Sequence, residues 1–458
     1  MKPVVQNIFR AYDIRGVVDS DFDPEWVETL GRACGAYFLE RGFAAAVVGH
    51  DCRHSSPGYQ NSLAAGLAAT GVDVTRIGHV PTPALYFAVK HLRRSAGVMI
   101  TASHNPSAYN GFKIWAGPTT IHTEEIQRIY RIMAAGAFPT GNGVVCDLDI
   151  APSYLDELAA RLKPVPAGRT VRVVLDGGNG SGGALCEALL RRMGAEVIPL
   201  YCDADGSFPN HHPDPLIEAN MADLKAAVVR EGADCGLALD GDADRVGVVD
   251  EKGAMVWGDQ VLALFARDML RDHPGATVIG DVKCTHRLFA DIAAHGGAPL
   301  MGVTGHSVMK ARMIETGAKL AGELSGHMFF ADRFFGFDDA LYAAARFVEL
   351  VAHAPHTPVS AMLADWPQTY STPELHIHCP DAIKFQVVAK AQAYFRERCD
   401  TSEVDGVRAT FADGWGLIRA SNTQPVLVLR FEAESEERLQ AIRDLMETPL
   451  TQWIKQLQ

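Results

Sequence analysis

One arrangement of strands and helices occurs three times along this sequence. Each copy has an apolar segment that ends at or beside an acidic residue, then a segment with helical spacing, then a second apolar segment. The copies are Ala44–His50, Tyr59–Ala69 and Val72–Ile77; Val171–Asp176, Leu185–Met193 and Glu196–Leu200; and Thr277–Val282, Arg287–His295 and Ala298–Val303. Strand–helix–strand units of this kind form parallel sheets. The sequence therefore predicts a weak three-fold repeat of α/β domains.

The C-terminal part of the chain follows a different order. After the segment Asp365–Pro373, the patterns predict a strand, a long helix, three strands and a final amphipathic helix. These are Leu375–His378, Ile383–Arg398, Gly406–Ala412, Gly416–Ala420, Val426–Phe431 and Glu436–Met446. Asp413-Gly414 between two of the strands is a hairpin signal. We expect a separate α+β module here.

Length and composition fit a multidomain enzyme. The 458 residues suggest three or four domains at roughly 150 residues each, and 48% are hydrophobic. The net charge of −13 disfavours nucleic acid and anionic membranes as partners. No uncharged apolar run approaches the ~18 residues of a membrane span, and the N-terminus lacks a signal-peptide pattern. Nine cysteines without a C-x-x-C pair argue against a disulfide framework. We expect a cytoplasmic protein.

A glycine-rich segment follows the strand Val171–Asp176. Gly178, Gly180 and Gly183 have the spacing of a dinucleotide-binding loop. Such a loop also needs an acidic residue at the end of the next strand, and Asp203 lies just beyond that position. A tight strand-to-helix turn is the favoured interpretation.

Three aspartates at alternate positions follow the apolar segment Cys235–Leu239. Asp240, Asp242 and Asp244 can converge from a turn onto one hard divalent cation, which would offset their mutual repulsion. An EF-hand loop is excluded because Arg245 stands where that loop requires glycine. In a second alternative, a phosphatase, Asp240 is the nucleophile and Asp242 the acid. The third aspartate and the arginine fit a metal-plus-phosphate site better.

Polar residues also crowd the segment after the apolar strand Ala96–Ile100. Here a proline and its polar neighbours predict a loop, and His104 and Lys113 place a base and a cation near the hydroxyl of Ser103. A serine that carries a phosphoryl group needs cations to neutralise about two negative charges. The acidic loop could hold a metal ion for this purpose, and Arg245 could supply a second cation. The alternative is an ordinary turn serine.

Two further segments carry binding chemistry. Residues 322–327 (GELSGH) place a carboxylate beside a hydroxyl, a pair that can accept from and donate to the vicinal hydroxyls of a sugar. Residues 419–423 (RASNT) combine a guanidinium, hydroxyls and an amide, the donor set that binds a phosphate dianion. A glycine-rich turn and a polar turn with a structural arginine are the alternatives.

Taken together, these motifs resemble those of the α-D-phosphohexomutase superfamily over essentially the whole chain, and within it the bifunctional bacterial mutases. The ordered set is FRAYDIRG (9–16), TASHNP (101–106), YNGFKI (109–114), FPNHHPDP (208–215), DGDADR (240–245), DVKCT (281–285), TGHS (304–307), GELSGH and RASNT. Leu324 replaces a methionine of those mutases, and Gln424 stands where threonine is commoner. The last loop differs from the R-x-S-G-T-E-P type of glucosamine-phosphate mutases.

The resemblance implies a fold of three similar mixed α/β domains and a C-terminal α+β domain of the TATA-box-binding-protein-like type, around a central cleft. The expected domains are residues 1–150, 151–253, 254–366 and 367–458. Because a bound intermediate must be retained while it turns, we expect the last domain to move as a lid.

The resemblance also implies an isomerase that interconverts the 1-phosphates and 6-phosphates of glucose and mannose. Ser103 is then carried as phosphoserine and binds Mg²⁺ together with Asp240, Asp242 and Asp244. The phosphoryl group passes to the substrate, and the resulting bisphosphate, such as glucose 1,6-bisphosphate, turns in the cleft and returns its other phosphoryl group to Ser103.

Further roles are implied by the same motifs. The acid/base candidates are His104, Lys113 and His306, and the supporting cations are Arg245 and Lys283. The sugar-binding residues are Glu323, Ser325 and His327. The residues expected to hold the phosphate that does not react are Arg419, Ser421, Asn422 and Thr423, with Tyr12 and Arg15 nearby.

Two other functions remain open at this point. A sugar phosphatase would release phosphate and would not need Ser103, and a metal-dependent sugar-phosphate-binding protein would bind without turnover. The expected partners are glucose 1-phosphate, glucose 6-phosphate, mannose 1-phosphate and mannose 6-phosphate, with the chain acting as a monomer.

Overall fold

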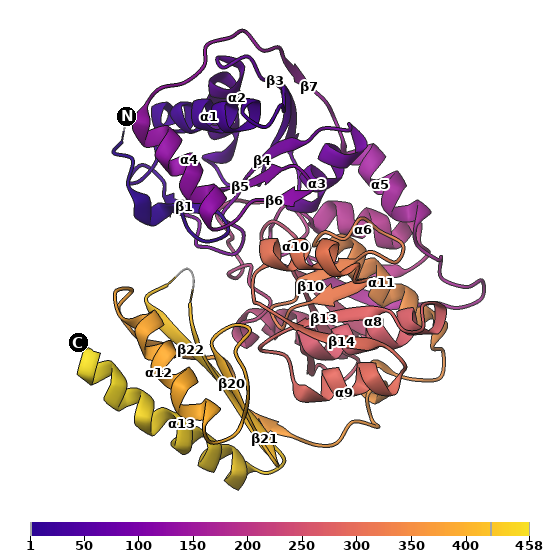
Figure 1. Cartoon of the computed structure of the whole chain (residues 1–458). Coiled ribbons are helices and arrows are strands. Elements are labelled where there is room, and N and C mark those ends of the chain that lie inside the picture. The colour runs from indigo at the N-terminus through magenta and orange to yellow at the C-terminus, as the bar shows by residue number, and fades with distance from the viewer. Residues whose placement is uncertain (1, 422–423, 458) are drawn as a thin grey trace.

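A computed structural model describes residues 2–421 and 424–457. The described residues form four β-sheets with helices packed against them. The N-terminal sheet lies at one end of the molecule and the C-terminal sheet at the other, with the second and third sheets between them (Figure 1). Within the described residues, no helix is both long enough and apolar enough to cross a bilayer.

The predicted strands and helices are all present in the predicted order, together with others that the sequence patterns did not single out. The first domain contains β1 (Ile14–Val17), α1 (Pro24–Leu39), β2 (Ala45–His50), α2 (Ser56–Ala68), β3 (Asp73–His79), α3 (Thr82–His91), β4 (Ala96–Ile100), β5 (Tyr109–Ala116), β6 (Thr119–Thr120), α4 (Glu124–Ala135) and β7 (Val145–Asp147). The second contains α5 (Ala151–Ala160), β8 (Arg172–Asp176), α6 (Gly183–Arg192), β9 (Glu196–Leu200), α7 (Ala222–Glu231), β10 (Cys235–Leu239) and β11 (Val246–Asp250), and the short β12 (Met255–Val256) that follows pairs into its sheet.

The second half of the chain forms two further domains. The third contains α8 (Gly258–Asp272), β13 (Thr277–Asp281), α9 (His286–Ala294), β14 (Ala298–Gly302), α10 (His306–Thr316), β15 (Leu320–Gly322), β16 (Met328–Phe330) and α11 (Ala340–His353). The fourth contains β17 (Tyr370–Ser371), β18 (Leu375–His378), α12 (Lys384–Arg396), β19 (Asp400–Ser402), β20 (Val407–Phe411), β21 (Gly414–Ala420), β22 (Val426–Ala433) and α13 (Glu436–Leu457).

The first three sheets share one four-stranded plan, which confirms the predicted repeat. In each, a central strand (β2, β8 or β13) is flanked by two parallel strands. One of these flanking strands (β4, β10 or β15) then pairs with the antiparallel strand that follows it in sequence. The sheets are therefore mixed rather than wholly parallel, as a connection that is too short for a crossover helix requires.

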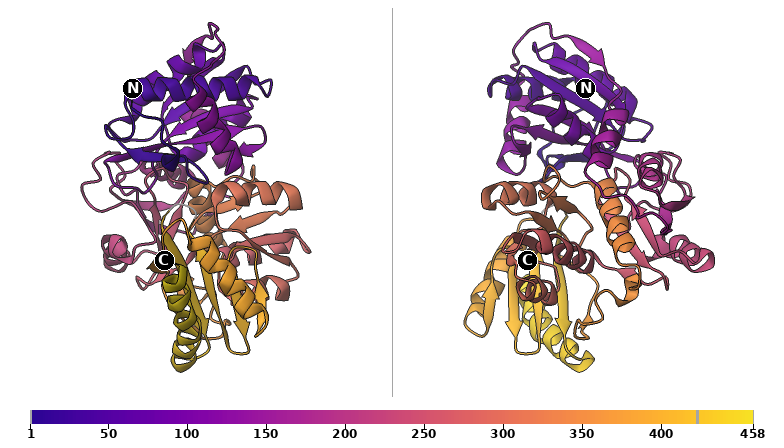
Figure 2. Two further views of the ribbon diagram at one scale, coloured as in Figure 1. Left: turned by 60° about the vertical axis from the view of Figure 1, so that its left-hand side comes forward. Right: turned by 90° about the vertical axis from the view of Figure 1, so that its right-hand side faces the viewer.

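The fourth domain is an antiparallel sheet with helices on one face. Helices α12 and α13 cover that face, and the other face turns toward the third domain (Figure 2). Residues alternate between the faces, so Ile418 packs under the helices and Leu417 packs against Val282 of the third domain. Helix α13 runs to Leu457, past the predicted end at Met446, because Leu450 and Ile454 beyond Pro449 are buried against the sheet.

The hydrophobic cores join the first three domains more closely than the fourth, although each of the three also has a separate apolar cluster of its own. A single apolar cluster runs through the first three domains and includes Tyr86 of α3, Leu189 of α6 and Phe347 of α11. The fourth domain has its own core, and the apolar contact that joins it to the third domain is a small cluster around Trp415. The first three domains therefore form a continuous body to which the fourth is attached.

Candidate active site

The residues predicted for catalysis lie on loops that occupy the same position in the three related sheets. In each domain the loop connects one strand parallel to the central strand (β4, β10 or β15) with the antiparallel strand that follows it in sequence. The loop after β4 carries Ser103, the loop after β10 carries the three aspartates, and the loop after β15 carries Glu323. We call these the serine loop (101–108), the acidic loop (240–245) and the sugar loop (323–327). Ligands of α/β sheets bind at this edge, outside the carboxyl ends of the strands.

The hydroxyl of the serine loop points at the acidic loop. Ser103 Oγ donates to Asp240 Oδ2 at 2.6 Å and lies 3.1 Å from Nδ1 of His104. The side chain is buried, with 1% exposed. Its φ of 49° lies in the left-handed region, which residues other than glycine enter rarely and mostly at functional sites.

The acidic loop approaches the serine loop so closely that one position must be glycine. A Cβ atom at Gly241 would lie 2.5 Å from the carbonyl oxygen of Ser103. The acidic loop is also held to the start of α3, where the hydroxyl of Thr82 donates to Asp242 Oδ2 at 2.5 Å and its backbone N–H donates to the Asp242 carbonyl. The two loops are therefore held together by backbone contact as well as by side chains.

A buried arginine that the sequence analysis missed supports the serine loop from behind. The guanidinium of Arg53 pairs with Asp51 at 3.1 Å and donates to the carbonyls of Ser103, Asn105, Pro106 and Tyr109. Arg53 is 1% exposed. An arginine two residues after the acidic end of a strand was the available signal, but nothing in the sequence joins it to a loop fifty residues later.

The three aspartates form a cluster suited to a divalent cation. Asp240, Asp242 and Asp244 are all buried, and one oxygen of each lies within 4.8 Å of the others. Lys113 Nζ donates to Asp242 at 2.7 Å and also to Asp244. Within the described chain, Asp242 Oδ1 is buried without a hydrogen-bond partner. Burial, together with the neighbouring carboxylates, raises the pKa of Asp240 well above its usual value. Hard oxygen donors that repel one another and leave one oxygen unsatisfied fit a metal ion.

The nearby basic groups differ in their protonation. Burial and the charge of Arg245 lower the pKa of His104 well below its usual value, and burial and Lys310 do the same for His306. Both imidazoles are therefore neutral at neutral pH. Burial alone would lower the pKa of Lys113, but Asp242 and Asp244 reverse the shift and raise it, so Lys113 is a cation.

The sugar loop forms a polar cluster beside the aspartates. Glu323 accepts from the backbone N–H of Gly305 at 2.9 Å and from the Ser325 hydroxyl at 2.8 Å. His327 bridges Glu323 and Asp244, with nitrogen–oxygen distances of 3.1 and 3.2 Å. Although burial opposes it, these two carboxylates raise the pKa of His327 to about 9. His327 stacks on His306, with ring centroids 5.5 Å apart.

Three other predicted residues contact the serine loop or join neighbouring domains. Arg15 donates to Asn105 of the serine loop at 2.7 Å, so it lies beside Ser103. Tyr12 donates its hydroxyl to the carbonyl of Thr304 at 2.8 Å, which joins the first and third domains. Lys283 pairs with Glu374 at 2.6 Å where the chain enters the fourth domain.

The loop between β21 and β22 is described only in part. Asn422 and Thr423, which the motif predicts as phosphate ligands, lie outside the described residues. Arg419 is buried and donates to Asp405 at 2.9 Å, and Asp405 also accepts the N–H of Thr304. Lys384, another residue that the sequence analysis did not select, donates to the carbonyl of Ser421 at 2.6 Å. A cation that binds backbone carbonyls leaves no sequence motif.

The glycines of the dinucleotide-like segment are explained by close packing. A Cβ at Gly183 would lie 2.7 Å from the backbone of Cys202, and one at Gly180 would lie 2.7 Å from the carbonyl of Gly241. The segment is a tight turn that supports the acidic loop.

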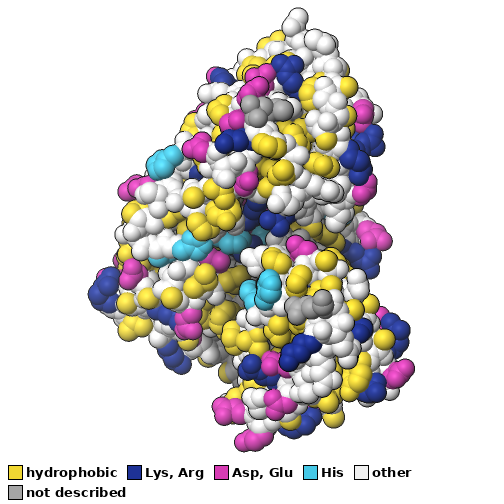
Figure 3. Space-filling view, turned by 90° about the vertical axis from the view of Figure 1, so that its left-hand side faces the viewer, with side chains coloured by type: hydrophobic (Ala, Val, Ile, Leu, Met, Phe, Trp, Pro, Cys, Tyr) yellow, Lys and Arg dark blue, Asp and Glu magenta, His cyan; other side chains and the backbone are white. Residues whose placement is uncertain are grey.

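Seen from the side that carries these loops, the molecule is hollowed between the N-terminal and C-terminal domains. Lysine, arginine and histidine side chains gather in that hollow (Figure 3). In a chain with a net charge of −13, this concentration of cations marks a place where an anionic ligand is favoured.

Comparison with known proteins gives a consistent result along the whole chain. Models of the phosphoglucomutase/phosphomannomutase alpha/beta/alpha domains I, II and III match residues 6–140, 152–253 and 257–370, and the model of the C-terminal domain matches residues 374–448. A phosphomannomutase/phosphoglucomutase from Pseudomonas putida is 45% identical over 454 residues, which cover 99% of this chain and 97% of that protein.

Two further similarities agree with this. A phosphoglucomutase from Neisseria gonorrhoeae is 44% identical over 97% of this chain and 96% of its own. The crystal structure of a phosphoglucomutase/phosphomannomutase family protein from Burkholderia thailandensis superimposes with a TM-score of 0.92 at 41% identity, over 99% of this chain and 98% of that one.

Proposed function

Since this chain belongs to the phosphoglucomutase/phosphomannomutase family and is thus an isomerase that interconverts hexose 1-phosphates and hexose 6-phosphates, we propose that Ser103 is the hydroxyl that carries the phosphoryl group. The observation that carries the proposal is the 2.6 Å hydrogen bond between Ser103 Oγ and Asp240, within a cluster of three buried aspartates. The substrates are the phosphates of glucose and of mannose, after the names of the relatives.

In the first step, a free hydroxyl of the hexose monophosphate attacks the phosphorus on Ser103. A bond forms between that oxygen and phosphorus, the bond from phosphorus to Ser103 Oγ breaks, and the product is a hexose 1,6-bisphosphate. After the bisphosphate turns, the other phosphoryl group returns to Ser103 Oγ and the second monophosphate leaves. Such a transfer depends mainly on alignment and charge neutralisation, which the left-handed backbone at Ser103 and its cationic neighbours favour.

The acidic loop holds a metal ion in this scheme, and we propose Mg²⁺. Asp240, Asp242 and Asp244 offer hard oxygen ligands, and a phosphoserine oxygen would be the fourth. When bound, Mg²⁺ neutralises charge on the phosphoryl oxygens. Lys113, which contacts two of the same carboxylates, supplies a further fixed positive charge.

Proton transfer falls to the neutral imidazoles. The attacking hydroxyl must lose a proton, and the serine oxygen must regain one when it departs. His104, whose Nδ1 lies 3.1 Å from Ser103 Oγ, is placed for the second task. His306 is the candidate for the first task because it is neutral and lies against the sugar loop. Lys113 keeps its proton and acts through its charge.

Recognition is divided between the remaining loops. Glu323 and Ser325 offer a carboxylate and a hydroxyl that can bind sugar hydroxyls in either orientation of the bisphosphate. Arg419 and Ser421, together with Asn422 and Thr423, bind the phosphate that is not reacting, and Lys283 adds a nearby cation. Tyr12, Arg15, Arg245 and His327 complete the walls of the site. We also propose that the chain acts as a monomer, and its nine free thiols support a cytoplasmic location. We retain residues 1–150, 151–253, 254–366 and 367–458 as the proposed domains, with β12 pairing into the second sheet.

The test is an assay of glucose 1-phosphate with Mg²⁺ and a trace of glucose 1,6-bisphosphate, followed for both glucose 6-phosphate and inorganic phosphate. Ser103→Ala should abolish formation of glucose 6-phosphate, and the purified wild-type chain should show one added phosphoryl group by intact mass. Ser107→Ala, on the exposed part of the same loop, is the matched control and should retain activity. Removal of the metal with EDTA should stop turnover, and Mg²⁺ should restore it.

Other results would favour the other functions. Activity of Ser103→Ala with release of inorganic phosphate would indicate a phosphatase with Asp240 as nucleophile. Binding of glucose 1-phosphate without turnover by the wild type would indicate a binding protein.

A further inference from the structure

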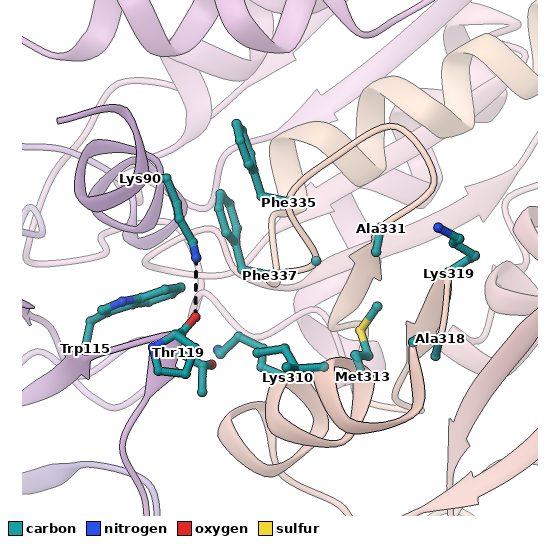
Figure 4. A pocket seen from close by; sticks show the side chains of 14 residues that line it. Lys90, Trp115, Thr119, Lys310, Met313, Ala318, Lys319, Ala331, Phe335 and Phe337 are labelled. Atoms are coloured by element: carbon teal, nitrogen blue, oxygen red, sulfur yellow. Dashed lines mark hydrogen bonds between the residues drawn. The ribbon is translucent and has the colours of Figure 1, made fainter. Parts of the chain in front are cut away.

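A pocket with a volume of about 410 Å³ lies between the first and third domains, apart from the loops of the active site. One wall is formed by Lys90 at the end of α3 and by Trp115 and Thr119 of the β5–β6 hairpin. The opposite wall is formed by α10 and the turn that leads into β15, with Met313, Ala318 and Lys319 (Figure 4). A volume of this size accommodates a small organic ligand.

The charges of the pocket have one sign. Its fourteen lining residues include Lys90, Lys310 and Lys319 and no acidic residue. Lys310 is neutralised by Asp338 at 2.5 Å. Among the described residues, neither Lys90 nor Lys319 has a carboxylate partner; Lys90 Nζ contacts the carbonyl of Pro118 and the face of Trp115. In a chain with a net charge of −13, two unpaired ammonium groups at one pocket favour an anion.

The rest of the lining is apolar and aromatic. Trp115, Phe335 and Phe337 contribute rings, and the rings of Phe335 and Phe337 are stacked with an interplanar angle of 9°. Phe335 is 36% exposed and Ile314 is 58% exposed, so part of this apolar surface faces solvent. A flat ring on the ligand would cover that surface.

The pocket is connected to the active site through one side chain. Lys310 contributes its stem to the lining, and its Nζ lies 3.0 Å from Nδ1 of His306. The two walls also meet next to the pocket, where Thr120 Oγ donates to Ser307 Oγ at 2.8 Å. A ligand that contacts both walls would therefore stabilise the contact between the first and third domains.

From these observations we propose that the pocket binds a small aromatic anion of the nucleoside monophosphate type. Its phosphate contacts Lys90, its ring covers the apolar surface beside Phe335 and Ile314, and Lys319 on the opposite wall adds positive charge to the pocket. The site is separate from the hexose phosphate site and does not depend on the assignment of Ser103.

The proposal is tested by calorimetric titration of the full-length protein with adenosine 5′-monophosphate, while saturating glucose 1,6-bisphosphate occupies the active site. We expect one molecule bound per chain. Lys90→Glu should weaken binding about tenfold or more, the size of a hydrogen bond to a charged group, and Lys319→Glu, which reverses the second charge of the pocket, should weaken it less. Lys252→Glu, which reverses an exposed lysine in the second domain, is the matched control and should bind normally.

Two simpler probes separate the parts of the ligand. Adenosine lacks the anion and inorganic phosphate lacks the ring. Each should therefore bind at least about tenfold more weakly than the nucleotide. The proposal is overturned if adenosine 5′-monophosphate does not bind, if glucose 1,6-bisphosphate displaces it, if either simpler probe binds equally well, or if the three lysine variants bind alike.

Discussion

Single buried charges decide how the serine loop is held. Arg53 donates to three carbonyls of that loop and to the carbonyl of Tyr109 directly after it, and its charge is balanced by Asp51. Carbonyl oxygens of a loop cannot pair with one another, so without the guanidinium they would be buried without donors. The geometry of Ser103 therefore depends on a residue that takes no part in the chemistry.

Replacement of Arg53 by methionine should reduce both stability and activity. Because Asp51 would be left buried without its cation, we expect a loss of about 3–5 kcal/mol in the free energy of unfolding, and a fall in kcat as the serine loop becomes less ordered. Urea denaturation and the mutase assay measure the two effects. The control is Arg76→Met, which breaks an exposed pair with Asp147 and should cost about 1 kcal/mol or less. Equal losses in the two variants would contradict the assigned role.

Asp339 gives a prediction about pH. Burial raises the pKa of this carboxyl to about 7, although it accepts from Tyr154 and from the N–H of Tyr342 at the start of α11. A raised pKa means that the folded state binds the proton more tightly than the unfolded state. The contribution of Asp339 to stability is therefore complete below pH ~4 and is lost as the pH rises to about 7.

Asp339→Asn removes this titration and keeps an oxygen to cap the helix. The wild type should lose up to about 4 kcal/mol relative to the variant between pH 4 and pH 8. The measurement is the difference in thermal midpoint between the two proteins at several pH values. A difference that does not change with pH would show that Asp339 keeps an ordinary pKa.

At the scale of the elements, the sequence is most informative where a loop with several polar residues follows a strand. The serine and acidic loops were predicted because each follows a short apolar segment and holds several polar residues, and the sugar loop because it places a carboxylate beside a hydroxyl between glycines. The three-fold repeat was also visible in this pattern. The antiparallel pairing of the strand after each loop, the supporting roles of Arg53, Lys310 and Lys384, and the extension of α13 beyond Pro449 were not predicted. Each of these depends on contacts between segments that are distant in sequence, or on burial that overrides a local stop signal.

The contact between the serine and acidic loops can be tested at Gly241. Gly241→Ala would bring a Cβ to 2.5 Å from the carbonyl of Ser103, so the loops must separate. A displacement of this kind should lower kcat by about a hundredfold. Gly58→Ala, at an exposed site in α2 where an added Cβ meets no atom, should keep full activity and stabilise the helix by about 0.5–1 kcal/mol. A Gly241→Ala enzyme with normal turnover would show that the loops tolerate separation.

At the scale of the whole molecule, the attachment of the fourth domain permits motion. Its core is separate from the continuous core of the other three. Much of the contact with the third domain is polar: Arg408 donates to the carbonyls of Val282 and Cys284, and Thr285 donates to Glu432. Interfaces of this kind within a chain commonly allow relative domain motion.

We expect the fourth domain to close over the cleft when a bisphosphate binds. Small-angle X-ray scattering should show a smaller radius of gyration for the Ser103→Ala protein with glucose 1,6-bisphosphate than without it, since that variant cannot accept a phosphoryl group. Glucose, which lacks phosphates, serves as the negative control. An unchanged radius with saturating bisphosphate would contradict the lid.

The repeated sheet has an evolutionary consequence. Since three catalytic loops occupy one and the same connection in three copies of a module, the ancestral unit needed only a tolerant connection at the open edge of its sheet. After duplication, each copy could specialise: one for covalent capture, one for the metal and one for the sugar. A change of substrate would then require substitutions in only one of these loops, while the other two loops and all three sheets stay unchanged.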